Sequence, residues 1–253
     1  METLRDKIYD RNELIWGKEA QNLLFQKHVA VFGLGGVGSS AAEALARSGI
    51  GKITVVDFDE VAETNINRQL LAFNSNIGEK KVFLMENRIK NINPAIQVMA
   101  INDFCAKALT EKIFSGQIDY VIDAIDTLKT KVDLLESCVI KNIPVISSLG
   151  AGNRLDPTQL YTADISEVNP RSCDFVRYVV SKLKARGITQ GLTVVLSAEK
   201  PISVEKRLSC VEIKTKTGEN IELKKISPGS SPFVPPVAGF IMASHIVRSF
   251  ISK

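Results

Sequence analysis

A short apolar segment that runs directly into a glycine-rich turn constrains this chain more than any other feature. Residues 29–32 are apolar and rich in β-branched residues, the turn reads Gly33-Leu34-Gly35-Gly36-Val37-Gly38-Ser39, and helix-forming residues follow. This pattern predicts a strand, a G-x-G-x-x-G turn and a helix, in which the turn's backbone and the start of the helix can bind phosphate groups. The alternative is a tight turn without a ligand. The residues we expect to contact a nucleotide here are Gly33, Gly35, Gly36, Gly38 and Ser39.

Strands and helices alternate over the first 150 residues. Apolar segments predict further strands at residues 53–56, 96–101, 119–123 and 145–147, with helices at residues 78–90, 107–114 and 129–141. The strands are continuous apolar runs, as expected when helices cover both faces of a parallel sheet. We therefore predict an α/β fold, with a doubly wound, Rossmann-like and mostly parallel sheet.

The pattern changes after residue 150. Residues 151–170 are interpreted as a long connection with one short apolar piece, and residues 171–186 as an amphipathic helix. Further strands are expected at residues 193–196, 208–214 and 220–226, the last two forming a hairpin around Thr217-Gly218. Pro235 and Pro236 suit the first turn of a terminal helix. We predict a nucleotide-binding core at residues 1–150. The extension at 151–253, with antiparallel strands and a terminal helix, should pack as one continuous domain with it.

The segment before the first strand has helical spacing. Apolar residues recur along residues 12–26 in the pattern of one amphipathic helix, and such a helix buries its apolar stripe against the core. The expected buried positions are Leu14, Ile15, Leu23, Leu24 and Phe25.

Polar residues gather where the predicted strands end. Asp57 closes the second strand, where an acidic residue takes the ribose hydroxyls of a nucleotide. Arginine and lysine can neutralise a triphosphate, and a carboxylate can hold Mg²⁺ against it. Such a set serves nucleotidyl transfer and has no use in hydride transfer. Taken singly, Arg68 could form a surface ion pair, and Lys80 or Lys81 could be a solvated residue at a helix start. Asp126 could be the N-cap of the helix that follows. The segments that contribute are Asn65-Ile66-Asn67-Arg68-Gln69, Gly78-Glu79-Lys80-Lys81 and Asp123-Ala124-Ile125-Asp126.

Together these motifs resemble the ubiquitin-activating-enzyme-like adenylating family, which includes the enzymes that adenylate sulfur carriers. The shared elements are G-x-G-G-x-G-S, D-x-D, N-x-N-R-Q, G-x-x-K and D-A-x-D, within residues 11–126. The resemblance implies a homodimer that binds ATP and Mg²⁺. It implies that Arg11 reaches the neighbouring subunit's ATP site and that Asp126 organises Mg²⁺. The remaining residues it assigns to ATP are Asp57, Asp59, Asn65, Arg68 and Lys81.

The second half of the chain narrows the resemblance to one branch of that family. Gly150-Ala151-Gly152, Asp156-Pro157-Thr158-Gln159 and the segment at residues 233–245 are similar to the tRNA threonylcarbamoyladenosine dehydratases. The resemblance implies ATP-dependent cyclisation of threonylcarbamoyladenosine beside the tRNA anticodon, through a carboxyl-adenylate. The alternative within the family is adenylation of the C-terminal glycine of a ubiquitin-like sulfur carrier. Two other interpretations are a hydride-transferring dehydrogenase and a non-catalytic dimeric scaffold.

The charge distribution agrees with a nucleic-acid partner. The chain has 32 basic and 28 acidic residues, and the net charge of the helix expected at residues 171–186 equals the whole excess of +4. A basic stripe on an amphipathic helix suits phosphate contacts, although it is also compatible with a solvated helix face. The residues that we expect to contact tRNA are Arg171, Arg177, Lys182, Lys184 and Arg186.

The cysteines argue against the sulfur-carrier alternative. The chain has four, none in a Cys-x-x-Cys pair, whereas sulfur-carrier activators commonly hold zinc with two such pairs. The segment at residues 227–233 also lacks the cysteine that some dehydratases use with a desulfurase, so a sulfur-transfer partner is not favoured. Cys105, Cys138 and Cys210 are expected in the core. No apolar signal core begins the chain, and His245 and Arg248 interrupt its longest apolar stretch. We therefore expect a cytoplasmic protein without a membrane partner.

Overall fold

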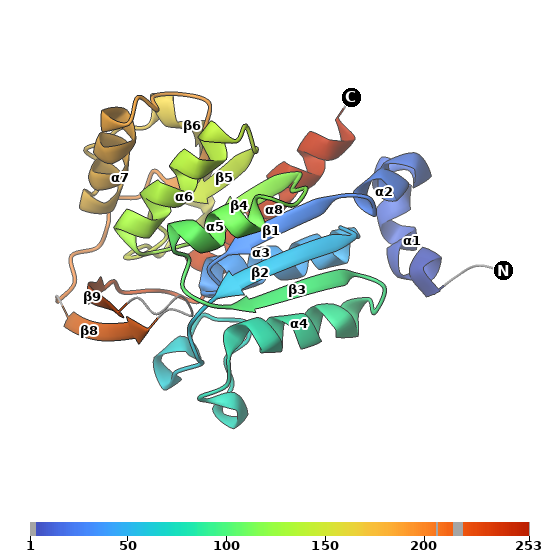
Figure 1. Ribbon diagram of the computed structural model, residues 1–253, viewed down its shortest axis with the longest axis horizontal. Coiled ribbons are helices and arrows are strands. Elements are labelled where there is room, and N and C mark those ends of the chain that lie inside the picture. The colour runs from blue at the N-terminus through green and yellow to red at the C-terminus, as the bar shows by residue number, and fades with distance from the viewer. Residues whose placement is uncertain (1–3, 206, 215–219, 253) are drawn as a thin grey trace.

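The computed structural model describes residues 4–205, 207–214 and 220–252. Its centre is a seven-stranded sheet in the order β3-β2-β1-β4-β5-β7-β6, in which only β6 runs antiparallel to its neighbour. This arrangement confirms the predicted doubly wound, mostly parallel sheet (Figure 1). The strands are β1 (His28–Phe32), β2 (Lys52–Asp57), β3 (Gln97–Asn102), β4 (Tyr120–Asp123), β5 (Val145–Ser148), β6 (Leu160–Asp164) and β7 (Thr193–Ser197).

Helices cover both faces of the sheet, as expected from its continuous apolar strands. On one face α3 packs against α4 and α8, and on the other α6 lies between α5 and α7 (Figure 1). All five residues of β1 are buried, because this strand lies in the middle of the sheet between both layers. The helices are α1 (Leu4–Trp16), α2 (Lys18–Leu24), α3 (Gly36–Ser48), α4 (Lys81–Ile92), α5 (Lys107–Ile113), α6 (Leu128–Ile140), α7 (Asp174–Ala185) and α8 (Val234–Ile251).

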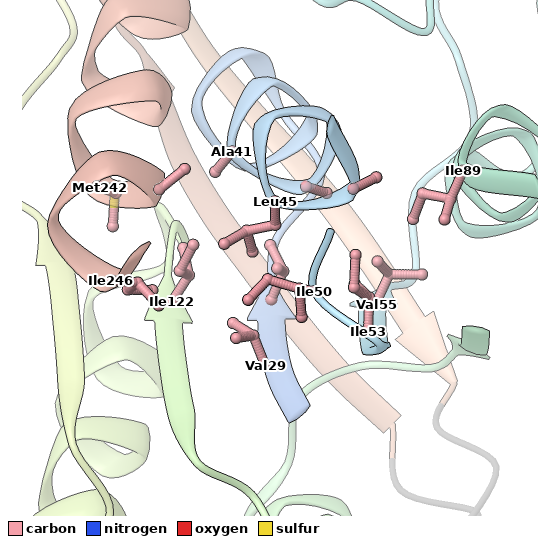
Figure 2. Close-up of a cluster of buried hydrophobic side chains, with 14 of the residues drawn as sticks. Val29, Ala41, Leu45, Ile50, Ile53, Val55, Ile89, Ile122, Met242 and Ile246 are labelled. Atoms are coloured by element: carbon pink, nitrogen blue, oxygen red, sulfur yellow. The ribbon is translucent and has the colours of Figure 1, made fainter. Parts of the chain in front are cut away.

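The core beneath α3 and α8 is tightly packed. Figure 2 shows Leu45 of α3 and Ile246 of α8 meeting Val29 and Ile122 of the sheet. A Cβ on Gly239 of α8 would lie 2.2 Å from a backbone oxygen of α3, so only glycine allows the two helices to approach this closely. By length and composition, α8 is the one helix of the described residues that could cross a membrane. Its packing on α3 gives its apolar face a place in the core.

The expected single helix at residues 12–26 is wrong. The structure has two helices, α1 and α2, and Gly17 between them adopts a φ of +83°, which ends the first helix. Leu14 and Ile15, expected in the core, are 74% and 80% exposed, and α1 instead packs on the core through Tyr9 and Trp16. Of the other expected core positions, Leu24 is buried, whereas Leu23 and Phe25 are half-buried.

The second half of the chain completes the sheet. The connection expected at residues 151–170 contains strand β6, which forms the sheet edge, and β7 inserts between it and β5. A separate antiparallel hairpin follows, made of β8 (Arg207–Lys214) and β9 (Asn220–Ser227), as the sequence predicts. Its expected turn, Thr217-Gly218, lies outside the described residues, and Cys210 outside the described side chains. Whether residue 150 divides two units stays a prediction.

Candidate functional site

The expected site residues come together at the carboxyl edge of the sheet. Strand β1 lies between β2 and β4. After β1 the chain forms β2 and β3 on one side of it, and then crosses over to form β4 on the other side. The chain therefore continues from β1 to α3 on one face of the sheet and from β4 to α6 on the other, and the expected ligand crevice lies where these two connections start. Open α/β sheets bind their ligands at such a switch point.

Three glycines of the turn after β1 are required by the protein's own packing. Gly33 has a φ of +89°, and a Cβ there would lie 2.8 Å from the carbonyl oxygen of Ala124. A Cβ on Gly38 would lie 1.7 Å from the carbonyl oxygen of Gly33, and one on Gly36 would lie 3.0 Å from Pro235. The turn therefore presses against the loop after β4 and against the start of α8.

Gly35 differs from the other three glycines. The nearest atom to a Cβ on Gly35 would be Nε2 of Gln69, at 3.9 Å, so packing does not explain this glycine. Gly35 also precedes α3 without a side-chain cap, which leaves backbone N–H groups of the first turn facing the crevice. Ser39 is buried and its hydroxyl donates to the Gly35 carbonyl oxygen at 2.7 Å, so it holds the turn; its contact with a nucleotide stays a prediction.

Gln69 is a site residue that the sequence prediction did not select. Its side chain is buried and faces Gly35, and its Oε1 has no hydrogen-bond partner. A buried, unpaired amide oxygen is costly unless a ligand or water satisfies it. The signal was available, since Gln69 ends the Asn65-Ile66-Asn67-Arg68-Gln69 motif.

The acidic loop after β2 holds the glycine turn from the other side. Asp57 is buried, and its carboxylate accepts hydrogen bonds from Leu34 N–H at 2.5 Å and Asp59 N–H at 2.8 Å. Burial raises the pKa of Asp57, and the neighbouring Lys81 opposes that rise. Lys81 is itself buried and forms an ion pair with Asp59 at 2.9 Å. This finding rules out the solvated helix start as an explanation of Lys81.

Arg68 lies against the glycine turn, and the charge of Asp126 acts on it. The backbone oxygen and Cγ of Arg68 lie 3.1 and 3.5 Å from the position of a Cβ on Gly36, so Arg68 covers the start of α3. Burial lowers the pKa of Arg68, and the charge of Asp126 opposes that shift, which places the two charges near each other. Asn65 is engaged locally, since its Oδ1 accepts a hydrogen bond from Ala62 N–H at 3.2 Å.

Arg11 lies far from this edge within the same chain. Its neighbours in α1 contact the last turn of α3: Tyr9 Oη donates to the Ala46 carbonyl and Asn12 Nδ2 to the Arg47 carbonyl, both at 2.8 Å. The glycine turn is at the other end of α3, whose 13 residues span about 20 Å. Arg11 therefore cannot serve the ATP site of its own subunit.

The basic helix expected at residues 171–186 is α7, and it starts at the same edge as the glycine turn. A Cβ on Gly150, just after β5, would lie 3.6 Å from Sγ of Cys173, the residue that precedes α7. Arg171, Lys182 and Lys184 are exposed. Arg186 instead forms ion pairs with Asp133 and Glu136 of α6, at 2.6 and 2.9 Å, so it fastens α7 to the protein.

Cys138 is buried in the core, as expected, whereas Cys105 is half-buried and packs against the core. Burial raises the pKa of the Cys105 thiol to about 12 and raises that of Cys138 still further, so neither forms a reactive thiolate near neutral pH. In the described part of the chain, no group of three or more His, Cys, Asp or Glu residues could hold a metal ion. The observed cysteines therefore give no support to a zinc site.

Comparison with known proteins identifies the family. A family model described as the ThiF family matches residues 9–252. The chain belongs to the ThiF family. Its relatives include the tRNA threonylcarbamoyladenosine dehydratase of Bacillus subtilis, 44% identical over 96% of this chain and 94% of the relative. The enzyme of the same name from Escherichia coli is 33% identical over 94% of this chain and 91% of the relative.

A solved structure extends the match to the whole fold. The ThiF-family chain superposes on the crystal structure of Escherichia coli tRNA N6-threonylcarbamoyladenosine dehydratase in complex with ATP with a TM-score of 0.85. The two are 30% identical, and the match covers 100% of this chain and 98% of that one. The resemblance expected from the motifs is thereby confirmed.

Proposed function

We propose that this protein uses ATP to dehydrate threonylcarbamoyladenosine in tRNA, closing a ring within the modified nucleoside. Two observations together support this proposal. The chain is similar over nearly its full length to tRNA threonylcarbamoyladenosine dehydratases, and Gly35 has no atom within 3.9 Å of the position of a Cβ. The donor group of Gln69, its Nε2, lies nearest to that open glycine, and Arg68 lies beside Gly36, so the groups around the turn suit a polyanion. They fit ATP, whose phosphates would lie against the first turn of α3, with its ribose near Asp57.

The chemistry is carboxylate activation. The substrate carboxylate attacks the α-phosphorus of ATP, the bond to the β-phosphate breaks, and pyrophosphate leaves. A nitrogen of the same substrate then attacks the activated carbonyl and expels AMP, which carries away one carboxylate oxygen. The net change in the nucleoside is loss of one water. No protein nucleophile is required, because positioning and charge stabilisation lower the barrier.

The protein's charged groups have separate tasks in this proposal. Arg68 and Lys81 neutralise the β- and γ-phosphates, for which Lys81 would exchange its present partner Asp59 for phosphate oxygens. Asp126 would hold Mg²⁺, because it is an exposed carboxylate beside Arg68 at the strand edge. When bound, Mg²⁺ would neutralise phosphate charge.

The tRNA would approach along α7. Three cations of this region, Arg171, Lys182 and Lys184, are exposed, and the helix begins beside Gly150 at the edge where ATP would bind. Phosphate contacts of this kind position a nucleic acid without reading its sequence. Arg177 would contribute less to phosphate binding, since it forms an ion pair with Asp174 at 2.8 Å.

We also infer a homodimer in which Arg11 acts on the partner's site. Leu14 and Ile15 on the same helix are exposed apolar side chains, which the fold of one subunit leaves uncovered. A groove lined by Leu71, Phe73, Leu84 and other residues of α4 and the preceding loop could receive such a helix. Localisation in the cytoplasm stays a prediction.

The test of this function is pyrophosphate release. Purified protein with ATP and Mg²⁺ should release pyrophosphate only when tRNA that carries threonylcarbamoyladenosine is added, and unmodified tRNA should give background. Pyrophosphate release that instead depends on a ubiquitin-like carrier with a C-terminal glycine would establish the alternative. The absence of Cys-x-x-Cys pairs favours the tRNA substrate.

A further inference from the structure

A fully buried ion pair lies beneath the loop that carries Asp126. Lys131 of α6 and Asp123 at the end of β4 are both 0% exposed, and Lys131 Nζ lies 2.5 Å from Asp123 Oδ2. Ser147 of β5 closes the group, since its Oγ donates to the same carboxylate oxygen at 2.6 Å and lies 3.1 Å from Lys131 Nζ. The sequence prediction treated Asp123 as one of two carboxylates at the end of this strand, but Asp123 is buried against Lys131 and Ser147, whereas Asp126 is exposed.

The pair determines the shape of the loop between Asp123 and Asp126. The second oxygen of Asp123 accepts a hydrogen bond from Ile125 N–H at 3.1 Å, which folds the loop back on the strand end. Within this loop, Ala124 N–H donates to the Phe32 carbonyl oxygen at 2.8 Å. The Ala124 carbonyl oxygen would lie 2.8 Å from a Cβ on Gly33, so it packs closely against that glycine. The buried carboxylate therefore connects Asp126 with the glycine turn.

The same ammonium group also reaches α7. Lys131 Nζ lies 6.0 Å from the ring centre of Phe175, in the first turn of that helix. One buried cation thus lies beside the end of β4, strand β5 and the start of the basic helix. A cation at this distance from an aromatic ring is attracted to its face.

We propose that Lys131 is a positioning residue that acts through Asp123 to fix Asp126 and the glycine turn for ATP. The role toward Asp126 rests on the proposed function. General stabilisation explains the pair poorly, because replacing a buried ion pair with apolar residues of similar volume is often neutral or stabilising. The location of the pair explains it better, since its contacts join the end of β4, strand β5 and the start of α7 at the carboxyl edge of the sheet.

The opposite end of β4 provides a matched control. There Asp119 accepts a hydrogen bond from His28 N–H at 2.8 Å and lies 3.4 Å from Lys27 Nζ, so a second lysine–aspartate pair, half-buried rather than fully buried, lies at the far end of the same strand. Lys27→Met and Lys131→Met therefore remove similar charges from the two ends of one strand. Only the second change should affect the ATP site.

The first experiment combines calorimetric ATP binding with a double-mutant cycle. Lys131→Met should weaken ATP binding about tenfold in the wild-type background and change it less than twofold in an Asp126→Ala background, because coupled residues are not additive. Lys27→Met should change binding less than twofold in either background. Equal losses in both backgrounds would overturn the proposal, since Lys131 would then not act through Asp126.

A second variant covers the case in which Lys131→Met does not fold. The double variant Asp123→Asn/Lys131→Met removes both buried charges, so it should unfold near the wild-type temperature. Its kcat should still fall at least tenfold with an unchanged KM for tRNA, and its Ile125 amide should exchange hydrogen at least tenfold faster. A kcat within twofold of wild type, with normal protection of Ile125, would overturn the proposal. If wild-type protein does not dehydrate the nucleoside, the proposed function fails, while ATP binding and exchange still test the positioning role.

Discussion

The carbonyl oxygen of Gly33 occupies the space that a side chain on Gly38 would need, with only 1.7 Å between it and the position of a Cβ. The two residues are the first and last glycines of the turn, so the turn closes on itself. Gly35 lies between them, and the nearest atom to a Cβ at that position would be 3.9 Å away. Glycines in one motif therefore serve two purposes, close packing at its ends and an open space in its middle.

Alanine at Gly38 should lower the stability of the protein, whereas alanine at Gly35 should weaken ATP binding. Gly38→Ala should lower the free energy of unfolding by about 3 kcal/mol or more, because a backbone oxygen cannot yield to the new methyl group. Gly35→Ala should leave the melting temperature nearly unchanged and weaken ATP binding about tenfold or more, because its methyl group projects toward the phosphates. Thermal unfolding and calorimetry measure both. A stable Gly35→Ala variant with wild-type ATP affinity would remove this glycine from the ATP site.

Arg11 and Asp126 should complement each other between subunits. Arg11→Ala and Asp126→Ala should each lose at least about 100-fold in kcat, as expected when a charge-stabilising group is removed. Mixed in equal amounts and allowed to exchange subunits, they should recover about a quarter of the wild-type rate. Half of the dimers are then mixed, with one complete site each. Absence of recovery despite measured subunit exchange would place Arg11 outside the partner's site.

Charge reversal on α7 should weaken tRNA binding selectively. Replacing Arg177, Lys182 and Lys184 with glutamate should reduce affinity and lower the slope of log K against log salt by about two, because each lost phosphate contact contributes about 0.7 to 0.9. ATP binding should not change. Arg186→Gln serves as the control, since its ion pairs with α6 predict a loss of stability and little effect on tRNA. An unchanged salt slope in the triple variant would exclude α7 from the tRNA interface.

Stability should fall as the pH is lowered below neutrality. Burial lowers the pKa of His28, whose Nε2 and Nδ1 lie 2.8 and 2.6 Å from Thr54 Oγ1 and the Gln117 carbonyl. The unfolded chain, with a histidine pKa of about 6.5, therefore binds a proton first, and folding loses free energy between that value and the lower folded pKa. Denaturant unfolding at pH 7.5 and 5.5 should show a smaller decrease for His28→Gln than for wild type. Because burial also lowers the pKa of His245, His245→Gln separates its contribution.

The fold was predictable because local patterns and global topology agree. Continuous apolar strands such as β1, β2 and β4 can be buried only between two helical layers, and the glycine turn fixes the order of strand and helix. The edge strand β6 was missed because its residues are mostly half-buried or exposed, so they lack the apolar run that marked the central strands. The break at Gly17 was missed because helical periodicity continues across it, although the backbone there is left-handed.

Site residues could be predicted where the residue type suggests a single role. They were harder to predict where contacts with distant side chains determine whether a residue is available. Asp126 and Arg68 were placed together as expected, but Asp123 in the same motif is buried against Lys131. Only the tertiary structure brings α6 under the end of β4, so no local pattern separates the two aspartates. Likewise, nothing in the sequence distinguishes Arg186, held by α6, from the exposed Lys184 of the same helix.

The mass of the product nucleoside tests the central claim most directly. Purified protein is incubated with ATP, Mg²⁺ and tRNA that carries threonylcarbamoyladenosine, the tRNA is digested without harsh base, and the nucleoside is weighed by mass spectrometry. The account predicts loss of one water that requires ATP and is absent with Asp126→Ala. An unchanged nucleoside from protein that demonstrably binds ATP and the tRNA would contradict it.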